Sequence, residues 1–317
     1  MNILITGSTG FVGTNLQEYL AKTGLPFTIY NLSRSELAGS VLDFSKLLKD
    51  QNINTIVHLA GKAHDLKKKS TPEEYYLVNA ELTTKLYEAF ADSNASKFIF
   101  ISSVKAVADK VVSNLSESFV PAPATDYGKS KLLAEYKIQT TILSEGKSFY
   151  ILRPCMIHGP GNKGNFNLLY DFARRGIPYP LAAFKNKRSF LSITNLCFVI
   201  NSFLLRQNIP SGIYHVADEE ALSTNRMMEI FGEVMGKAPR MLNISPRLIR
   251  AIARLGDILP LPINSERLQK LTENYLVSNK KLIDALGEPL PIMSEEGLRI
   301  TVQSFYNNAD GKKFMKV

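Results

Sequence analysis

The residues best suited to chemistry are a tyrosine and a lysine four positions apart. Tyr127 and Lys131 stand in the segment YGKSK, where a stretch of helical periodicity begins. Residues at this spacing lie on one face of a helix. An ammonium group beside a phenol favours the phenolate, so we expect the pKa of Tyr127 to lie below its usual value of about 10. Such a phenol can exchange a proton with a substrate oxygen near neutral pH.

A serine hydroxyl ends the apolar segment FIFISS, at Ser103. At the carboxyl end of a strand it can hydrogen-bond the same substrate oxygen. A YxxxK pair alone occurs on many solvated helix faces. Its weight here comes from order, because a glycine-rich turn comes first, the strand-end serine follows, and Tyr127 and Lys131 come last.

The glycine-rich turn TGSTGFVG spans Thr6–Gly13, between an apolar segment and a helical pattern. Glycines allow a tight turn and a close approach of the backbone to a pyrophosphate. The N-terminus of the following helix offers free N–H groups and the positive end of the helix dipole. This strand–turn–helix context predicts a dinucleotide site rather than a plain connection.

The end of the second apolar segment bears on the choice of cofactor. An NAD site usually has an acidic residue there, which binds the ribose 2′-hydroxyl. This chain has Asn31, with Arg34 three residues on. Without a carboxylate to repel a 2′-phosphate, and with Arg34 able to pair with one, we expect NADP(H) to be favoured over NAD(H). If Arg34 is a solvated loop residue, either cofactor binds.

Apolar segments alternate with helical patterns through the first half of the chain. Strands are expected at Ile3–Thr6, Phe27–Tyr30, Thr55–Leu59, Phe98–Ser102, Phe149–Leu152 and Gly212–Val216, and helices at Val12–Lys22, Ser45–Asp50, Glu73–Ser93 and Gly128–Ser144, with Asp126 as the N-cap of the last. This alternation is typical of a parallel sheet covered on both faces. The predicted fold class is α/β, a Rossmann-like doubly wound parallel sheet with a smaller mixed α/β C-terminal substrate domain.

One segment of the C-terminal part is strongly amphipathic. In Pro246–Leu255, three arginines share one side against apolar residues: Arg247, Arg250 and Arg254 against Leu248, Ile249, Ile252 and Leu255. A helix at a membrane surface fits this pattern. An ordinary surface helix of the small domain also fits it and is the interpretation we favour.

Composition excludes several classes of function. The net charge is +9, but no recognition motif with interleaved aromatic residues predicts nucleic-acid binding. The two cysteines, Cys155 and Cys197, lie in apolar stretches, and the histidines lack metal-ligand spacing, so we expect no disulfide and no metal site. No signal peptide and no membrane span are expected, which predicts a cytoplasmic protein.

The motifs together resemble the extended short-chain dehydrogenase/reductase family, also called the NAD-dependent epimerase/dehydratase family. The matching segments run through nearly the whole chain in the same order: TGSTGFVG, VHLAG (Val57–Gly61), Asn79 of YLVNAELT, FISS (Phe100–Ser103), YGKSK, RPCMIHGPG (Arg153–Gly161), KRSFLSITNL (Lys187–Leu196) and LG…P…EEGL (Leu286–Leu298).

The resemblance implies a role for each matching position. The catalytic set would be Ser103, Tyr127 and Lys131; the cofactor would contact Gly7, Thr9, Gly10, Phe11, Val12, Gly13, Asn31, Arg34, Asp43, Phe44, Leu59, Ala60, Gly61, Asn79, Tyr127, Lys131 and Pro154; and the substrate would contact Lys105, Asn165, Arg188 and Arg267. Residues 1–157 plus 190–217 would form the Rossmann domain, and residues 158–189 plus 218–317 the nucleotide-sugar domain. A homodimer, paired through two helices that include Tyr127–Ser144, is implied as well.

Three reactions are known on this scaffold: 4-epimerisation, 4,6-dehydration and 4-keto reduction of nucleotide sugars. The dehydratases carry an Asp-Glu pair after the catalytic Ser/Thr, whereas Val104 and Lys105 follow Ser103 here. The usual Tyr-Gly a few residues later is replaced by Val107 and Ala108. The segments SSVKA, RPCMIHGPGNKGNF and NKRSFLSITNL are similar to those of bacterial reductases of UDP-4-keto-6-deoxy-N-acetylhexosamines, which make surface-polysaccharide precursors. A UDP-hexose or UDP-N-acetylhexosamine 4-epimerase, and a non-catalytic nicotinamide-binding sensor, are the alternatives.

Overall fold

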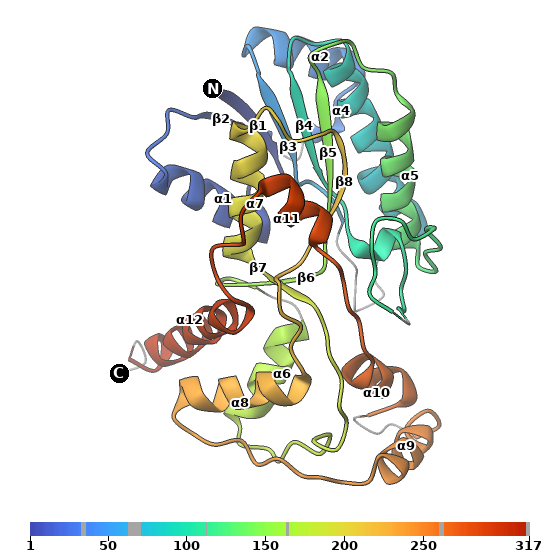
Figure 1. Cartoon of the computed structure of the whole chain (residues 1–317), viewed down its shortest axis with the longest axis vertical. Coiled ribbons are helices and arrows are strands. Elements are labelled where there is room, and N and C mark those ends of the chain that lie inside the picture. Colours follow the sequence, from blue (N-terminus) through green and yellow to red (C-terminus); the bar gives the residue numbers. More distant parts are fainter. Residues whose placement is uncertain (33–35, 63–70, 112, 163–164, 260–262, 315–317) are drawn as a thin grey trace.

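The computed structural model describes residues 1–317 except 33–35, 63–70, 112, 163–164, 260–262 and 315–317. The fold consists of a larger part built on a parallel sheet and a smaller part beneath it (Figure 1). Arg34 lies outside the described residues, so its predicted contact with the cofactor stays a prediction.

The sheet has six parallel strands in the order β2-β1-β3-β4-β5-β8. They are β1 (Asn2–Thr6), β2 (Thr28–Asn31), β3 (Thr55–His58), β4 (Lys97–Ile101), β5 (Ser148–Pro154) and β8 (Gly212–Val216). The strand order reverses between β1 and β3, and in such sheets the crevice outside the carboxyl ends of the strands at this point takes the ligand. The predicted doubly wound α/β fold is confirmed.

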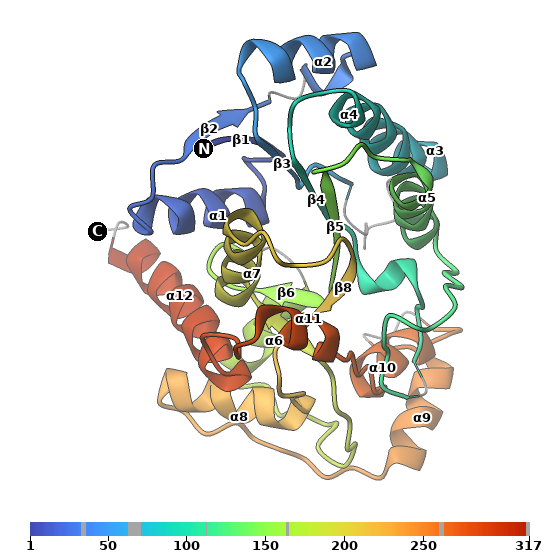
Figure 2. The ribbon, with the colours of Figure 1, turned by 45° about the horizontal axis from the view of Figure 1, so that its top comes forward.

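Helices cover both faces of this sheet (Figure 2). One hydrophobic core lies between the sheet and α1 (Phe11–Lys22), α7 (Ile193–Leu205) and α11 (Lys280–Leu286). The other lies against α2 (Val41–Asp50), α4 (Leu82–Ala91) and α5 (Asp126–Thr140). Burial on both faces explains why the strands are continuously apolar rather than alternating.

The predicted strands agree with the structure to within two residues at each end. The helix expected over Glu73–Ser93 is instead interrupted: α3 (Pro72–Tyr75) passes into a π-helical segment (Tyr76–Glu81) before α4 begins. π-Helical turns occur frequently at functional sites, and this one carries Asn79. The N-cap of α5 is Thr125, whose side chain accepts from the Gly128 N–H, so the assignment of Asp126 as N-cap was wrong.

The smaller part has a hydrophobic core of its own, which includes Tyr170, Phe231 and Leu298. Its helices are α6 (Asn165–Arg174), α8 (Thr224–Met235), α9 (Pro246–Leu255), α10 (Ser265–Thr272) and α12 (Ser294–Phe314). The parallel pair β6 (Met156–His158) and β7 (Phe190–Ser192) lies between the two parts. The predicted domain boundaries, near residues 157, 190 and 217, are compatible with this separate core and remain a prediction.

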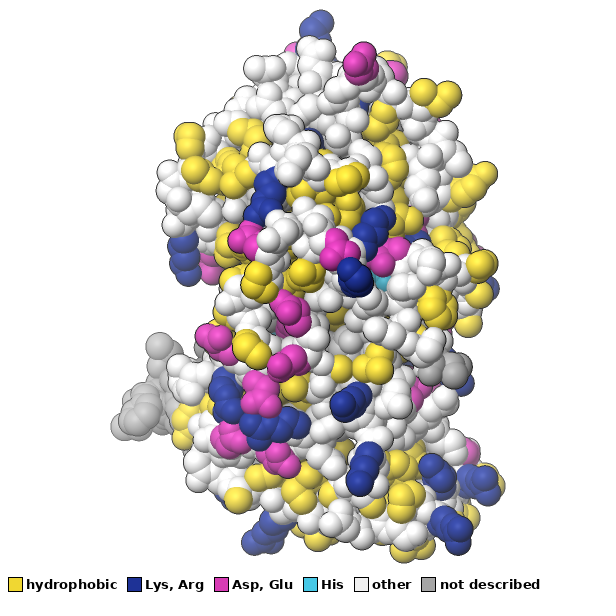
Figure 3. Space-filling model, in the orientation of Figure 1, with side chains coloured by type: hydrophobic (Ala, Val, Ile, Leu, Met, Phe, Trp, Pro, Cys, Tyr) yellow, Lys and Arg dark blue, Asp and Glu magenta, His cyan; other side chains and the backbone are white. Residues whose placement is uncertain are grey.

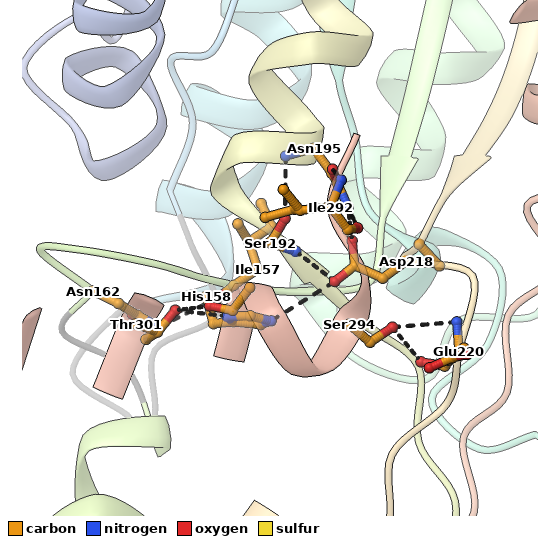
Figure 4. A network of polar contacts seen from close by, with 12 residues as sticks. Ile157, His158, Asn162, Ser192, Asn195, Asp218, Glu220, Ile292, Ser294 and Thr301 are labelled. Carbon is orange, nitrogen blue, oxygen red and sulfur yellow. Dashed lines mark hydrogen bonds and ion pairs between the residues drawn. The ribbon is translucent and has the colours of Figure 1, made fainter. Parts of the chain in front are cut away.

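A buried polar network fastens the two parts together (Figure 4). Asp218, just after β8, accepts hydrogen bonds from the Ser192 backbone N–H at 3.0 Å and from the Asn195 side chain at 2.7 Å. His158 lies 3.9 Å from Asp218 and 2.9 Å from the Thr301 hydroxyl of α12. Burial raises the pKa of Asp218 to about 7 and lowers that of His158 to about 4. These contacts fix α12 and β6 against the end of the sheet.

Candidate active site

The predicted catalytic residues come together beyond the carboxyl end of β4. β4 leads directly to Ser103, and α5, which carries Tyr127 and Lys131, packs beside the short 3₁₀ turn Val104–Ala106. A Cβ atom on Gly128 would lie 2.4 Å from the Lys105 carbonyl oxygen. Glycine at this position therefore lets the start of α5 press against the turn that presents Ser103.

Ser103 and Tyr127 meet side chain to side chain. The Ser103 hydroxyl forms a hydrogen bond with the Tyr127 phenol, which favours the phenolate. The same hydroxyl oxygen accepts the Lys105 backbone N–H at 3.2 Å. The Tyr75 ring packs edge-on to the Tyr127 ring at 6.2 Å between centroids. The sequence analysis missed Tyr75, although its place just ahead of Asn79 could have suggested that it lies near the site.

The expected lowering of the Tyr127 pKa is not found in the protein chain alone, and that expectation was wrong. Burial raises the pKa of the phenol above its usual value, and the Ser103 hydrogen bond only partly opposes this. A Tyr75 phenolate and the Glu135 carboxylate add to the rise. Burial therefore favours the protonated phenol.

Lys131 is almost fully buried beneath the site. Its ammonium group donates to the Ile101 carbonyl at 2.9 Å and lies 4.7 Å from the centre of the Phe100 ring. Burial lowers the pKa of Lys131 to about 8, while the nearby Glu135 opposes the drop. A Cβ atom on Gly61 would come within 3.0 Å of this nitrogen and of the Asn79 side-chain oxygen. Gly61 therefore leaves room for Lys131 to reach the floor of the site.

A buried ion pair lies one helical turn beyond Lys131. Glu135, one helical turn further along α5, pairs with Arg153 of β5 and also accepts from the Ser102 hydroxyl. Both members of the ion pair are at most 2% exposed. The sequence analysis did not identify this pair; the signal was the i, i+4 spacing of Lys131 and Glu135, which puts both on one helix face.

His58 is a structural residue that links the turn after β1 to the helical side of the site. Its ring nitrogens contact the Thr6 hydroxyl at 2.7 Å and the Thr83 hydroxyl at 2.9 Å. Thr6 in turn accepts the Ala60 N–H, and Thr83 donates to the Asn79 carbonyl. Burial, with Lys131 adding to it, lowers the pKa of His58 to about 3, so the ring is neutral at neutral pH.

The glycine-rich turn forms a seat that fits a pyrophosphate. A Cβ atom on Gly7 would lie 2.7 Å from the Ala60 backbone nitrogen, and one on Gly13 would lie 2.4 Å from the Gly7 carbonyl oxygen. The N-cap of α1 is Gly10, and no side chain caps this helix end. The first N–H groups of α1, on Phe11, Val12 and Gly13, therefore lack a side-chain cap and could bind an anion; their contact with the cofactor stays a prediction.

Of the three described residues predicted near the adenosine half of the cofactor, two have exposed side chains and one is buried in the core. Asn31 is exposed at the end of β2 and donates to the Gln17 side chain at 2.9 Å. Asp43 is exposed, but its carboxylate caps the start of α2 through Ser40, which lowers the pKa of Asp43. Phe44 is buried in the core between the sheet and α2, so its side chain is turned away from the crevice.

The remaining predicted cofactor contacts lie around the crevice. Thr9 is exposed at the tip of the turn, Leu59 and Ala60 follow β3, and Pro154 ends β5. Asn79 is fully buried and holds Lys62 through two backbone hydrogen bonds of 2.8 and 3.1 Å, besides a third to the Ser130 hydroxyl. Asn79 thus acts on the site by positioning the backbone after Gly61.

Basic side chains gather near Tyr275 in a group that we call the opposite wall of the site: Lys105, Arg188 and Lys270. Lys105 donates to the Asp109 carbonyl and lies 4.4 Å above the Tyr275 ring. Burial lowers the pKa of Lys105, and the cations Arg188 and Lys270 lower it further. Arg188 is half-buried and donates to the Lys270 carbonyl of α10. The structure therefore brings Lys105 and Arg188, two of the predicted substrate contacts, into one basic cluster, with Glu273 as a nearby counter-charge.

The other two predicted substrate contacts are less informative. Arg267 is exposed on α10, three residues before Lys270. Asn165 begins α6, and its side chain lies outside the described part of the structure.

Among the described residues, no group of histidine, cysteine and acidic side chains could hold a metal ion. No helix in the described ranges combines the length and apolarity needed to cross a bilayer.

Taken together, the fold and site define a dinucleotide-dependent enzyme of the short-chain dehydrogenase/reductase class. The family model "NAD dependent epimerase/dehydratase family" matches residues 3–217. The chain belongs to this family, as the sequence motifs had indicated.

Relatives catalysing two different reactions are similar to this chain. UDP-glucose 4-epimerase of Vibrio cholerae is 30% identical over 326 residues, which cover 96% of this chain and 95% of the relative. UDP-2-acetamido-2,6-beta-L-arabino-hexul-4-ose reductase of Pseudomonas aeruginosa is 31% identical over 172 residues, covering 53% and 38%. RMD of Pseudomonas aeruginosa, solved in complex with NADPH, has the same fold, with a TM-score of 0.73 at 20% identity over 97% of this chain and 99% of that one.

The chain is therefore an NAD(P)-dependent enzyme of the nucleotide-sugar 4-epimerase and 4-reductase family. The family description names NAD, while the structural neighbour holds NADPH. The glycine seat and the uncapped start of α1 are compatible with either cofactor, since both share the pyrophosphate.

Proposed function

We propose that this protein reduces the C4 keto group of a nucleotide-linked, UDP-bound deoxy-amino sugar, with NAD(P)H as the reductant, in bacterial surface-polysaccharide synthesis. The observation that carries the proposal is the hydrogen bond between the Ser103 and Tyr127 side chains, with the buried Lys131 one helical turn further along α5. These three groups can hold and protonate an oxygen at the edge of the dinucleotide seat. The bound cofactor would supply the hydride.

The protein residues would divide the remaining work. Ser103 would hold the keto oxygen, and Tyr127 would deliver a proton to it as the hydride reaches carbon. Because burial keeps the Tyr127 phenol protonated, it is ready as the acid for reduction. Lys131, with its pKa of about 8, remains mostly charged near neutral pH and would stabilise the phenolate left behind.

Dehydration fits the site poorly. Val104 is buried and Lys105 is bonded to the Asp109 carbonyl, at the two positions after Ser103 where a dehydratase has its acid–base pair. Both side chains thus lack the proton-transfer role that removal of water from the sugar requires.

The basic cluster supports a substrate that carries a diphosphate. Lys105 lies within electrostatic reach of Arg188 and Lys270. Burial is the main cause that lowers the pKa of Lys105; repulsion from the two cations adds to it, while Asp109 and Glu273 oppose it. A diphosphate bound there would relieve this repulsion, and the Arg188 guanidinium could form a bidentate pair of hydrogen bonds with it. We propose Arg188 as the main diphosphate contact, with Arg267 as a second one at the edge of α10.

NADP(H) is proposed as the preferred cofactor. The end of β2 carries Asn31, an exposed neutral side chain, where an acidic residue would repel the 2′-phosphate. A homodimer through α5 is proposed as well, because Leu133 and Tyr136 are exposed on that helix, at 50% and 65%.

4-Epimerisation of a UDP-hexose or UDP-N-acetylhexosamine is the second candidate. It is favoured by the similarity to the Vibrio cholerae epimerase along nearly the whole chain. An epimerase uses the same residues but keeps its cofactor bound and returns the hydride to the opposite face of the sugar.

Incubation with a UDP-4-keto-6-deoxy-N-acetylhexosamine and NADPH or NADH tests the proposal. Reduction consumes one reduced nicotinamide for each sugar, seen as loss of its absorbance, and Tyr127→Phe abolishes this loss. Interconversion of UDP-hexoses without net consumption of cofactor would replace reduction by epimerisation. Ligand-dependent stabilisation without turnover of either substrate would indicate a sensor and overturn both.

A further inference from the structure

The amphipathic helix α9 leaves most of its apolar side uncovered. Only Ile249 and Ala253 are buried against the small domain. Leu248 and Leu255 are 54% and 55% exposed, and Ile252 is at the limit of exposure with 37%. An ordinary surface helix turns its apolar stripe to the core. α9 buries one narrow stripe and presents a second one outward.

The apolar patch continues beyond the end of the helix. Ile258 is 84% exposed and Leu259 is 52% exposed, directly after α9 ends at Leu255. The α9 patch, as we call Leu248, Ile252, Leu255, Ile258 and Leu259, is thus formed by five large aliphatic side chains within twelve consecutive residues. Scattered single apolar residues need no explanation, but a contiguous group of this kind marks an interaction site.

Arginines lie on the side of α9 next to this patch. At 100° per residue, Arg247, Arg250 and Arg254 fall within one sector, between the buried stripe and the exposed apolar stripe. The Cζ atom of Arg250 lies 5.8 Å from the centre of the Phe184 ring, so this side chain lies along the surface of the small part. None of the three forms an ion pair with any residue in the described ranges.

One acidic group lies within the stretch that forms the patch. α9 itself contains no Asp or Glu, and the nearest one along the chain, Asp257, is held by the backbone and hydroxyl of Ser265. The surface therefore offers three arginines and five aliphatic side chains together, with the single carboxylate of Asp257 turned to hydrogen bonds from Ser265. Figure 3 shows basic side chains gathered among hydrophobic ones at the end of the molecule where α9 lies.

We propose that α9 docks this enzyme on the surface of a lipid bilayer that contains anionic phospholipids. The aliphatic side chains of the α9 patch enter the boundary between headgroups and acyl chains. The neighbouring arginines pair with lipid phosphates. Charge complementarity favours this occupant over a second copy of the chain, because the same patch on another copy would present the same arginines.

The position of α9 in the molecule agrees with this mode of binding. α9 lies at the end of the small part that is farthest from the sheet (Figure 1). A flat membrane surface could therefore approach α9 without meeting another element first. It packs on α10, whose Lys270 carbonyl accepts from Arg188 of the basic cluster. If α9 docks on the bilayer, only α10 lies between α9 and the basic cluster that contains Arg188.

Sedimentation of the purified full-length chain with vesicles tests the proposal. We expect it to pellet with vesicles of phosphatidylglycerol and phosphatidylcholine, and far less with phosphatidylcholine alone or at high salt. Arg247→Gln with Arg254→Gln should weaken the partition coefficient about 25-fold, at roughly fivefold for each charge lost. Leu248→Ser with Leu255→Ser should weaken it at least about tenfold, because aliphatic surface drives insertion.

The helix α2 offers a matched control. Like α9 it has ten residues, and it carries the exposed Leu42 together with the exposed lysines Lys46 and Lys49. The variant Leu42→Ser, Lys46→Gln, Lys49→Gln removes the same kinds of groups from the far end of the molecule. It should change vesicle binding by less than about threefold, since the local contact rather than net charge decides docking. All the substituted side chains are exposed, and circular dichroism checks that each variant is folded.

Three results would overturn the proposal. One is no pelleting with the anionic vesicles. Another is vesicle binding that both α9 variants retain, or that the α2 control loses equally. The third is lipid-free sedimentation velocity in which Leu248→Ser with Leu255→Ser converts an oligomer to a smaller species, because α9 would then contact a second copy. None of these measurements depends on turnover, so they stand apart from the proposed reductase activity.

Discussion

On the sheet side of the crevice, Lys131 is 4% and Ser103 8% exposed, and backbone groups of β4 and the following turn hold both. On the opposite side, Arg267 and Lys270 are exposed, and Arg188 is half-buried and anchored through a single backbone carbonyl. The first wall is packed into the core of the sheet. The second consists of long cationic side chains on a loop and a short helix.

Under the proposed function, the rigid group carries out the proton transfer and the exposed basic group binds the substrate diphosphate. Proton transfer requires groups fixed within a few tenths of an ångström, which a close-packed core provides. Holding a diphosphate requires charge more than fixed geometry, and flexible basic side chains supply it. Changes on the sheet side should therefore act on kcat, and changes on the opposite wall on KM.

The most severe test of this division is Tyr127→Phe. This substitution removes only the phenolic hydroxyl, which is the proton donor, and keeps the ring, so no large cavity opens. We expect kcat to fall about a thousandfold or more. Cofactor affinity should stay within about threefold of the parent value, since the glycine seat is untouched. Steady-state assay and fluorescence titration with NADPH measure the two effects. A variant with substantial turnover would remove Tyr127 from the proposed role.

Arg188→Ala tests the opposite wall. Removal of a charged hydrogen bond to a phosphate should raise KM for the nucleotide sugar about 50-fold, with kcat changed less than about threefold. Arg174→Ala is a suitable control, because this exposed arginine pairs only with Asp171 in the described contacts and lies on α6. A drop in kcat with KM unchanged would mean that the two walls are not divided as described.

Acid should destabilise the sheet side through His58. The folded pKa of this imidazole is about 3, against 6.5 unfolded, so between pH 7 and pH 5 only the unfolded chain gains a proton there. The free energy of unfolding should fall by about 2 kcal/mol from this group as the pH drops over that interval. Urea unfolding of the parent and of His58→Gln at both pH values measures it.

The His58→Gln variant should be less stable at pH 7 but should lose about 2 kcal/mol less on acidification than the parent. An equal loss in both proteins would show that His58 does not titrate as its burial indicates. The comparison of differences cancels other titrating groups, Asp218 and His158 included.

The smallest expected effect is on cofactor choice. Asn31→Asp places a carboxylate at the end of β2, where it should repel a 2′-phosphate and accept from a 2′-hydroxyl. The ratio of kcat/KM for NADPH to that for NADH should fall about tenfold. A parent enzyme that already prefers NADH would contradict the proposed NADP(H) preference before any substitution.

Sequence patterns located the fold well, and the catalytic set that they indicate stays a prediction. The strands of the sheet, the glycine-rich turn and the segment around Tyr127 were predicted because continuous apolar runs, glycine spacing and i, i+4 spacing are local signals. The helix around Asn79 was predicted as continuous, although it is interrupted by a π-helical segment, because such a segment has no strong local signal. The lowered pKa of Tyr127 was predicted from its neighbour in sequence, whereas burial, a tertiary property, decides the direction.

By itself, the sequence determined the order of strands and helices and the place of the glycine-rich turn, and it predicted which groups handle protons, since each of these depends on residues close together in the chain. Only the tertiary structure decided that Glu135 and Arg153 pair behind Lys131, that Lys105 joins Arg188 and Lys270 in one basic cluster, and that α9 turns its leucines outward. Those facts depend on which distant segments pack together. Packing, rather than local pattern, sets burial and therefore the charge and exposure of each group.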